Sequence, residues 1–249
     1  EAAPFGMFSP GAFMAAAFRR HMALYGSTTD HLGAIATTFR YHASLNPEAV
    51  LRTPMSIDDY RAVRPIVEPL RLFDYCLIND GGVALILTKT DRARDLRRPP
   101  AYILGFGQCS SLTDSAYPPR DFWRQASHAV SERAFAMSGR SLSDVNALMI
   151  YDSFSPCVLF SLEGFGFCPI GQSGAFVAEG RIRLGGALPT NTSGGHLSES
   201  YMQGYALNVE AVRQIRGECG ARQVPAASCV AYLCSGAITS SVIYGSEPT

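Results

Sequence analysis

The sequence has little charge and lacks the patterns that mark several common protein classes. Asp, Glu, Lys and Arg make up 17% of its 249 residues, and the formal net charge is zero. Charge alone therefore gives no basis for predicting nucleic-acid binding. The densest basic run, residues 92–98, is typical of a solvated turn, with a phosphate contact as the alternative. A run of about 18 apolar residues is missing, so no membrane span is expected.

Cysteine is present, but without the spacing of metal sites and disulfide frameworks. The seven cysteines include no CxxC pair, which argues against a zinc site and against a small disulfide scaffold. An odd number of cysteines in a chain rich in apolar residues fits a reducing cytosol, so we expect a cytoplasmic protein. The P-loop, HExxH and GxSxG motifs do not occur either, which removes the simplest signs of nucleotide, zinc-peptidase and serine-hydrolase chemistry.

Apolar residues, in contrast, are abundant. They make up 47% of the chain, which predicts a large buried core and excludes general disorder. A length of 249 residues suits one large domain or two small ones. The sequence opens at Glu1 with neither an initiator Met nor a signal peptide.

Helical periodicity dominates the first part of the chain. Apolar residues recur every three or four positions in two long stretches, and Thr29 or Asp30 is suited to cap the second. The predicted elements are helices over residues 11–25, 30–44 and 56–60, an extended crossing marked by Pro65 and Pro69, and, by local propensity, a strand over residues 83–87.

Strands and helices alternate from residue 101 onward. The predicted strands cover residues 101–108, 145–151, 224–232 and 238–244, and the predicted helices cover 121–137, 157–164 and 205–216. Gly139 and Gly217 are suited to end two of these helices. The first of the helices is expected to bury one apolar stripe, made of Phe122, Ala126, Ala129, Val130, Ala134 and Met137.

The most informative segment is a small polar loop over residues 189–204. It contains the adjacent glycines Gly194 and Gly195 and runs directly into the amphipathic helix that begins at Tyr205. Paired glycines permit positive φ or a close backbone approach, and a helix N-terminus offers unpaired N–H groups to an anion. An ordinary glycine-rich turn is the alternative interpretation.

The order of residues in this loop resembles the N-x-x-G-G-x-x-S-x-G-H-P-x-G segment of the thiolase superfamily. Asn191, Gly194, Gly195 and Ser198 match it, whereas Tyr201 stands where a thiolase has its catalytic His. Residues 148–154 resemble the thiolase N-E-A-F segment at the end of a strand. Tyr151 there takes the place of the oxyanion-hole Asn, Asp152 that of the Glu, and Phe154 that of the Phe.

The two tyrosines make the chain similar to the lipid-transfer-protein-like steroid aldolases of the Ltp2 type, within the sterol-carrier-protein branch of that superfamily. Residues 19–26, 40–47 and 79–86 also resemble this branch. The resemblance implies an α/β fold with a mixed five-stranded sheet and helices on both faces. It implies a helical loop domain over residues 1–75, the end of an N-terminal half-fold over 76–100, and a C-terminal half-fold over 101–249. The first part of the N-terminal half-fold is missing from the printed sequence, and we expect a segment of a longer chain.

The resemblance also implies a function. Such an enzyme cleaves a β-hydroxyacyl-CoA thioester, here expected to be a steroid 17-hydroxy side-chain ester, into a ketone and propionyl-CoA. Tyr151 and Tyr201 are then the acid–base and oxyanion pair, in an order that the sequence leaves open. The predicted catalytic site adds Asp152, which would bind the substrate hydroxyl or brace a loop, and His196, which would polarise a carbonyl, orient Tyr201 or simply shape the loop. The predicted substrate-binding residues are Asn191, Gly194, Gly195 and Ser198.

The same resemblance implies no metal and no organic cofactor. It implies an OB-fold partner of the DUF35 type and a homodimer of the thiolase-like subunit, together a heterotetramer. Two alternatives remain. One is a thiolase-like acyltransferase, which needs a nucleophilic cysteine, expected in the segment that the printed sequence does not contain. Cys229 and Cys234 lie near the second thiolase cysteine but lack its C-x-G-G-G context. The other is a non-catalytic lipid-transfer subunit, in which both tyrosines would serve only as packing residues.

Overall fold

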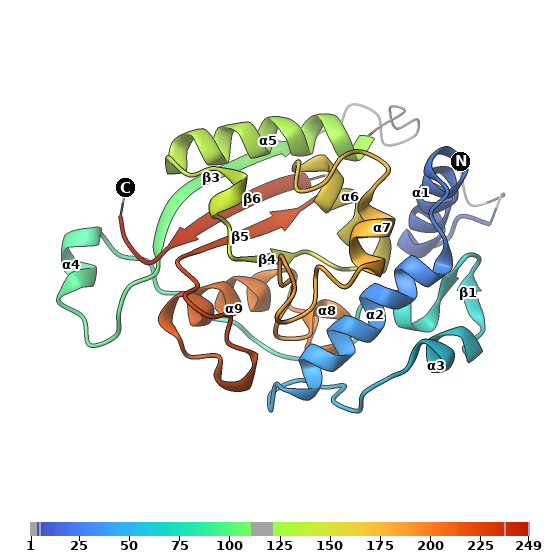
Figure 1. Cartoon of the computed structure of the whole chain (residues 1–249), viewed down its shortest axis with the longest axis horizontal. Coiled ribbons are helices and arrows are strands. Elements are labelled where there is room, and N and C mark those ends of the chain that lie inside the picture. Colours follow the sequence, from blue (N-terminus) through green and yellow to red (C-terminus); the bar gives the residue numbers. More distant parts are fainter. Residues whose placement is uncertain (1–3, 5, 111–121, 237, 249) are drawn as a thin grey trace.

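The computed structural model describes residue 4 and residues 6–110, 122–236 and 238–248. The N-terminal helices lie together on one side of the sheet, with α2 running across toward α8 (Figure 1). Their bounds are α1 Pro10–Tyr25, α2 Thr29–Ser44 and α3 Ile57–Ala62. The crossing expected around Pro65 and Pro69 is a small antiparallel hairpin, β1 Pro65–Val67 and β2 Leu70–Arg71.

The ends of these helices follow from local hydrogen bonds. Gly26 ends α1 with φ of 71°, and its N–H donates to Met22 O at 2.9 Å. Thr28 is the N-cap of α2, one position before the predicted cap, because its backbone N–H is satisfied by Nδ1 of His31 at 3.2 Å. Ser56 caps α3 as predicted, accepting from the backbone N–H of Asp59 at 3.1 Å.

The main sheet is mixed, as predicted, but it has four strands among the described residues instead of five. Their order is β3 Tyr102–Ser110, β6 Ile238–Gly245, β5 Cys229–Cys234 and β4 Ala147–Ile150, and only the last pair is parallel. On the edge of β4 that faces away from β5, the described chain forms only an isolated parallel bridge between Leu148 and Thr190. The next residue, Asn191, has φ of 49° and turns the chain away, so a fifth strand does not continue.

Helices cover both faces of the sheet (Figure 1). Helix α5 Phe122–Ser138 lies on β3 and β6 with α6 Ser155–Gly164 beside it, and α9 Tyr205–Arg216 lies on the opposite face against β4 and β5. Two glycines permit α5 to approach: a Cβ on Gly105 would lie 2.1 Å from Ala134 O, and one on Gly107 would lie 2.9 Å from Val130 O. Helix α9 has the predicted bounds and ends at Gly217 with φ of 70°.

The buried face of α5 differs from the predicted stripe. Ala126, Val130 and Ala134 are buried, but Ala129 and Met137 are exposed. The small polar residues between the apolar ones are buried as well: Ser131 donates to Phe165 O at 2.9 Å, at the end of α6, and Ser138 lies against Gly105 of β3. Asp121 and the side chain of Phe122 lie outside the described residues. The buried positions are Trp123, Ala126, Ser127, Val130, Ser131, Ala134, Phe135 and Ser138.

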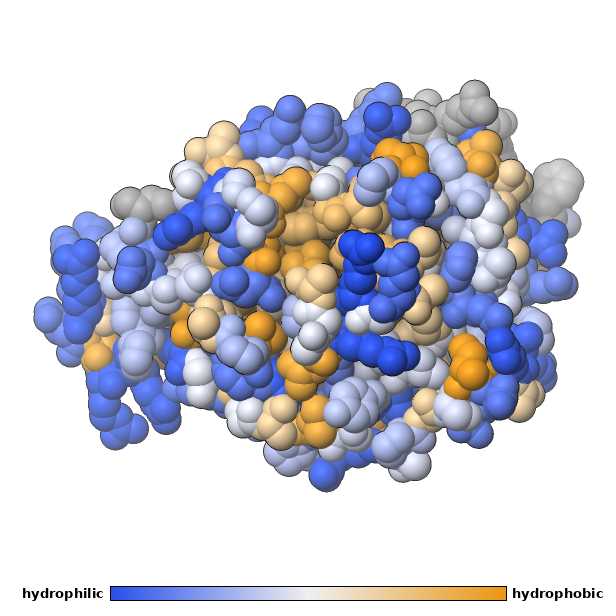
Figure 2. All heavy atoms as spheres, viewed as in Figure 1, coloured by the Kyte–Doolittle hydropathy of each residue, from blue (hydrophilic) through white to orange (hydrophobic). Residues whose placement is uncertain are grey.

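The strand predicted over residues 83–87 is wrong. Residues 76–89 contain neither helix nor strand, and Ile86 and Leu87 are 92% and 77% exposed. β-branched and aliphatic residues favour a strand only where a neighbouring strand accepts their backbone hydrogen bonds, and no described strand lies beside this segment. Figure 2 shows further apolar side chains at the surface over the centre of the molecule, whereas polar side chains cover α5 and α4.

Short elements complete the chain. Strand β5 begins at Cys229 and not at residue 224, and the loop over residues 189–204 contains one helical turn, α8. Among the described residues, no helix combines the length and apolar character that a membrane crossing needs. The predicted division into a loop domain and two half-folds stays a prediction. The short helices are η2 Leu72–Asp74, α4 Thr90–Arg94, η4 Leu142–Asp144, α7 Ser173–Ala178, α8 Gly195–Ser198 and η5 Gly220–Arg222.

Candidate active site

The site begins where β4 ends, because Asn191 ties the glycine loop to this strand. Its Oδ1 accepts the N–H of Ile150 at 2.6 Å, and its Nδ2 donates to Ile150 O at 2.8 Å. The backbone N–H of Asn191 donates to Leu148 O at 2.8 Å. The fully buried amide thus continues the ladder of β4 and places Tyr151 and Asp152 directly beside the loop.

Gly194 and Gly195 bring the loop close to its surroundings. Their φ angles are 110° and 62°, and a Cβ would lie 2.6 Å from Ala43 Cβ at the first position and 2.3 Å from Asp152 Oδ2 at the second. Only glycine satisfies both the backbone angle and the space. Ser198 follows at the end of α8 and accepts from Nε of Arg40 at 3.0 Å.

The N-terminus of α8 holds a carboxyl group that belongs to the protein itself. The backbone N–H groups of His196 and Leu197 donate to the two carboxyl oxygens of Asp152, at 2.9 and 3.3 Å. Asp152 is completely buried, and this burial raises the pKa of its carboxyl to about 8, although the two backbone hydrogen bonds act in the opposite direction. Asp152 therefore braces the loop, which is one of the two predicted roles.

His196 is a neutral imidazole between the two tyrosines. Burial lowers its pKa to about 3, and Nε2 accepts the N–H of Gly204 at 3.1 Å. The proton is therefore assigned to Nδ1, which lies 3.3 Å from Asp152 Oδ1, outside hydrogen-bond geometry. The ring contacts Tyr151 edge-on at 4.8 Å and Tyr201 at 5.1 Å between centroids, so it packs and orients both phenols.

Tyr151 and Tyr201 form a direct pair. Their hydroxyl oxygens lie 2.7 Å apart, and the hydroxyl of Tyr151 also lies 3.3 Å from Oε1 of Gln203. Burial, and then the hydrogen bond with Tyr201, raises the pKa of Tyr151 far above its usual range. Tyr151 is therefore a neutral phenol near neutral pH. The backbone N–H of Tyr201 donates to Oδ1 of Asn79 at 2.8 Å.

A cavity of about 460 Å³ lies next to this pair. Tyr201 and Gln203 line it, and the hydroxyl of Tyr151, which is not among the lining residues, contacts both of them. The resemblance of residues 79–86 included Asn79 without giving it a role, and no sequence pattern pointed to Gln203. None of the predicted substrate-binding residues lines the cavity; all four are buried, and their contact with substrate stays a prediction. The lining residues are Asn79, Asp80, Gly81, Gly82, Val83, Tyr201, Met202, Gln203 and Tyr205.

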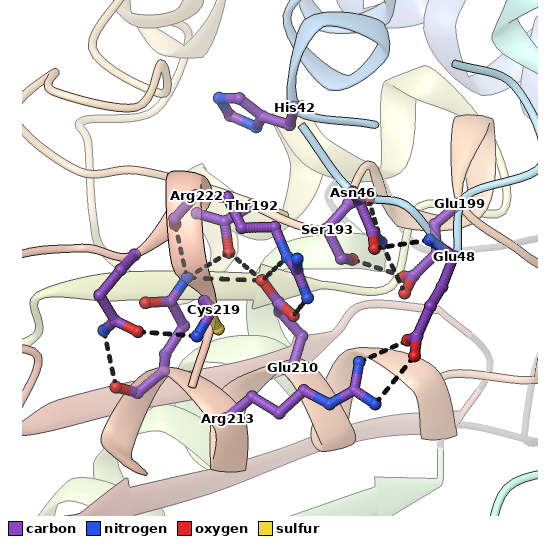
Figure 3. Close-up of polar contacts among 12 residues, drawn as sticks. His42, Asn46, Glu48, Thr192, Ser193, Glu199, Glu210, Arg213, Cys219 and Arg222 are labelled. Atoms are coloured by element: carbon purple, nitrogen blue, oxygen red, sulfur yellow. Dashed lines mark hydrogen bonds and ion pairs between the residues drawn. The ribbon is translucent and has the colours of Figure 1, made fainter. Parts of the chain in front are cut away.

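Polar contacts with the segment that follows α2 and with α9 hold the loop in place (Figure 3). Nδ2 of Asn46 donates to Ser193 O at 3.0 Å and to Glu199 Oε1 at 3.3 Å. Burial raises the pKa of the Glu199 carboxyl to about 7. On the other side Glu210 pairs with Arg222 at 3.0 Å.

Thr192 joins the loop to this second buried pair. Its hydroxyl donates to Glu210 Oε1 at 2.8 Å and accepts from Nε2 of Gln214 at the same distance. His42 of α2 adds a further tie, with Nδ1 3.2 Å from Asn191 O. These contacts explain why a loop without long regular structure is nevertheless fully buried from Thr190 to Ser198.

The cysteines near the site are protonated thiols. Burial raises the pKa of Cys76 and Cys234 to about 11 and that of Cys157 to about 12. Cys234 donates weakly to Ile238 O at 3.6 Å. None of its described hydrogen-bond partners is a base that would accept the thiol proton. No group of three His, Cys, Asp or Glu side chains suited to a metal ion occurs within the described residues.

The fold agrees with the comparison to known families. Residues 110–244 match the model of the family described as "Thiolase C-terminal domain-like", and the chain belongs to this family. The resemblance predicted from the loop and from the end of β4 is thereby confirmed at the level of the family.

Several characterised proteins are similar over most of the chain. The "Steroid side-chain-cleaving aldolase" of Thermomonospora curvata is 38% identical over 249 residues, covering 98% of this chain and 64% of that protein. The "17-hydroxy-3-oxo-4-pregnene-20-carboxyl-CoA lyase" of Mycobacterium tuberculosis is 40% identical, covering 86% of this chain and 57% of that protein. A solved structure of an "Ltp2-ChsH2(DUF35) aldolase" superposes with a TM-score of 0.92 at 38% identity, covering 98% of this chain and 65% of its own. The chain thus spans less than two thirds of the length of each of these relatives.

Proposed function

We propose that the protein is a retro-aldolase that cleaves a β-hydroxyacyl-CoA thioester, most specifically a steroid 17-hydroxy side-chain CoA ester, into a ketone and propionyl-CoA. The observation that carries this proposal is the phenol pair Tyr151–Tyr201, with oxygens 2.7 Å apart at the edge of a cavity of about 460 Å³. Two relatives whose names describe steroid side-chain cleavage and a pregnene-carboxyl-CoA lyase support the substrate class.

A retro-aldol step needs a proton acceptor and a proton donor. The bond between the α- and β-carbons breaks, the β-hydroxyl loses its proton, and the electron pair passes into the thioester enolate, which then takes a proton at the α-carbon. Both phenols are hydroxyl donors, so either stabilises the developing oxyanion, and together they relay a proton without leaving a phenolate behind. The raised pKa of Tyr151 suits this relay, because the neutral phenol keeps its proton until the enolate forms.

Asp152 and His196 hold the tyrosine pair in place. Asp152 holds the N-terminus of α8 through two backbone N–H groups, and His196 packs its ring against both phenols. Neither side chain is exposed, so we assign them to positioning the tyrosines and not to contact with the substrate.

An acyltransferase would need a thiolate. The raised pKa values of Cys76, Cys157 and Cys234 disfavour each as a nucleophile near neutral pH. A lipid carrier without catalysis would have no use for two hydrogen-bonded phenols beside the cavity. Within the described residues these observations favour the lyase; an acyltransferase nucleophile would have to come from outside the printed sequence.

We also propose the assembly that the resemblance implies. A DUF35-type partner is supported by the similar solved structure, whose name joins an aldolase to a DUF35 protein. The dimeric thiolase-like subunit, the heterotetramer, the cytoplasmic location and the lack of a cofactor stay predictions. Seven free cysteines are in keeping with a reducing compartment.

The test uses the complete polypeptide together with its DUF35-type partner. The complex is incubated with 17-hydroxy-3-oxo-4-pregnene-20-carboxyl-CoA, and the products are followed by mass spectrometry. A 17-ketosteroid and propionyl-CoA in equal amounts are the expected products. Intact substrate combined with acyl transfer to free CoA would replace the lyase with the acyltransferase. Binding of the ester without turnover would instead favour the carrier.

A further inference from the structure

The turn that carries Gln203 has a backbone conformation that glutamine rarely adopts. The N–H of Tyr205 donates to Met202 O at 2.9 Å, and the two residues between them have φ of 51° at Gln203 and 87° at Gly204. Positive φ costs glycine little conformational energy but is unfavourable for a residue with a Cβ. Strained residues of this kind gather at functional sites, so the glutamine side chain calls for a function.

That side chain reaches one of the two phenols. Oε1 of Gln203 accepts from the hydroxyl of Tyr151 at 3.3 Å, and the same hydroxyl lies 2.7 Å from that of Tyr201. A phenol has a single proton to donate. If Tyr151 donates it to Gln203, the hydrogen bond between the phenols runs from Tyr201 to Tyr151.

We propose that Gln203 is a positioning residue that fixes the direction of the Tyr201–Tyr151 hydrogen bond. The inference rests on the proposed retro-aldol function. With Tyr201 as donor within the pair, the lone pairs of its oxygen stay available to accept a proton, and Tyr201 is the member of the pair that lines the cavity. Tyr201 is then the group that accepts the proton of the substrate hydroxyl. Tyr151 holds the proton that is delivered to the α-carbon.

The proton transfers balance in this direction. As the bond between the α- and β-carbons breaks, the β-hydroxyl proton passes to Tyr201, the proton of Tyr201 passes to Tyr151, and the proton of Tyr151 leaves Gln203 for the α-carbon. The electron pair of the broken bond forms the new C–H bond. The β-carbon becomes a carbonyl, and both phenols end neutral. Gln203 exchanges no proton and only holds that of Tyr151 until the enolate is present.

The first test compares Gln203→Met with Gln203→Glu in the complete polypeptide with its partner. Met has the same unbranched shape without the amide acceptor, whereas Glu keeps an acceptor at the same distance along the chain. We expect Gln203→Met to lower kcat about tenfold with KM changed less than about twofold, the size of one neutral hydrogen bond. Gln203→Glu should keep most of kcat. Equal losses in both variants would overturn the proposal, because a merely structural turn residue would not distinguish them.

The second test needs no turnover. Tyrosine labelled with carbon-13 at Cζ reports by NMR whether its hydroxyl donates, and Tyr151→Phe assigns the signal among the tyrosines of the complete polypeptide, eleven of which lie in the printed sequence. The Tyr151 signal should move in Gln203→Met and stay near its wild-type position in Gln203→Glu. An unmoved signal in Gln203→Met would refute the orienting role. If the wild-type complex fails to cleave the steroid ester, the proposed function fails, and this measurement still decides the role of Gln203.

Discussion

The hydroxyl oxygens of Tyr151 and Tyr201 lie 2.7 Å apart, although 50 residues separate them in the chain. Tyr151 comes from the end of β4 and Tyr201 from the loop after α8. Asn191 joins the two segments by bonding both backbone groups of Ile150. The pair therefore depends on the hydrogen bonds that hold the loop to β4.

Removal of one hydroxyl should abolish most of the activity. Tyr201→Phe in the complete protein is expected to lower kcat by about two orders of magnitude or more, the scale of losing one acid–base or oxyanion group, while the fold survives. Steady-state kinetics with the steroid ester and circular dichroism check this. Tyr41→Phe, on an exposed tyrosine of α2, is the matched control. Turnover close to that of the wild type would remove Tyr201 from the mechanism.

Asp152 should make stability depend on pH. Its pKa of about 8 in the folded protein lies above the ordinary aspartate value of 3.8, so between these values the folded state holds a proton that the unfolded state lacks. The stabilisation is fully present below about pH 4 and is lost as the pH rises through about 8, by up to about 1.4 kcal/mol per pH unit.

Asp152→Asn removes this titration. The free energy of unfolding of the variant, measured with denaturant across this range, should therefore gain on that of the wild type as the pH rises. The exposed Asp91→Asn serves as control. Parallel profiles for Asp152→Asn and the wild type would contradict a carboxyl protonated by burial.

Gly195 should tolerate no side chain. Gly195 has φ of 62°, and a Cβ added there would lie 2.3 Å from Asp152 Oδ2. Gly195→Ala should therefore move the loop and lower kcat more than about tenfold. Gly217→Ala is the matched control, since φ is 70° there and nothing lies within 4 Å. The control should cost only the backbone strain, about 1 to 2 kcal/mol of stability, and leave kcat unchanged. Equal effects of the two substitutions would mean that the contact with Asp152 is unimportant.

Breaking the Glu210–Arg222 pair should lower the free energy of unfolding, whereas replacing both partners by apolar residues should restore much of it. Arg222 is 6% exposed and Glu210 is 1% exposed. Glu210→Gln leaves a buried charge unpaired and should lower the free energy of unfolding by about 3 to 5 kcal/mol. The double variant Glu210→Met/Arg222→Met should recover much of this loss in denaturant titrations. For comparison, Glu48→Gln breaks a more exposed pair with Arg213 and should cost about 1 kcal/mol or less.

Local signals predicted some elements well and others badly. The bounds of α9 follow from its amphipathic spacing and from Gly217, both of which are properties of the segment itself. The strand over residues 83–87 failed because a strand needs a partner, which local propensity does not contain. The buried stripe of α5 was misplaced at Ala129 and Met137, because the glycines of β3 that decide which side packs lie far away in sequence.

The site shows the same division. The order of residues in two motifs indicated Tyr151, Asp152, His196 and Tyr201, because each motif lies within one short stretch of the sequence. Asn79 lies 122 residues from Tyr201, and the resemblance of residues 79–86 gave it no role, so only the folded chain shows their hydrogen bond.

The sequence by itself thus determined the family, the helix at residues 205–216 and the tyrosines at two motif positions, because these depend on residues close together in the chain. Only the tertiary structure decided that Asp152 caps α8, that His196 is neutral, that the two phenols are hydrogen-bonded and that Gln203 contacts one of them. Burial and hydrogen-bond partners set these properties, and both come from segments that meet only after folding.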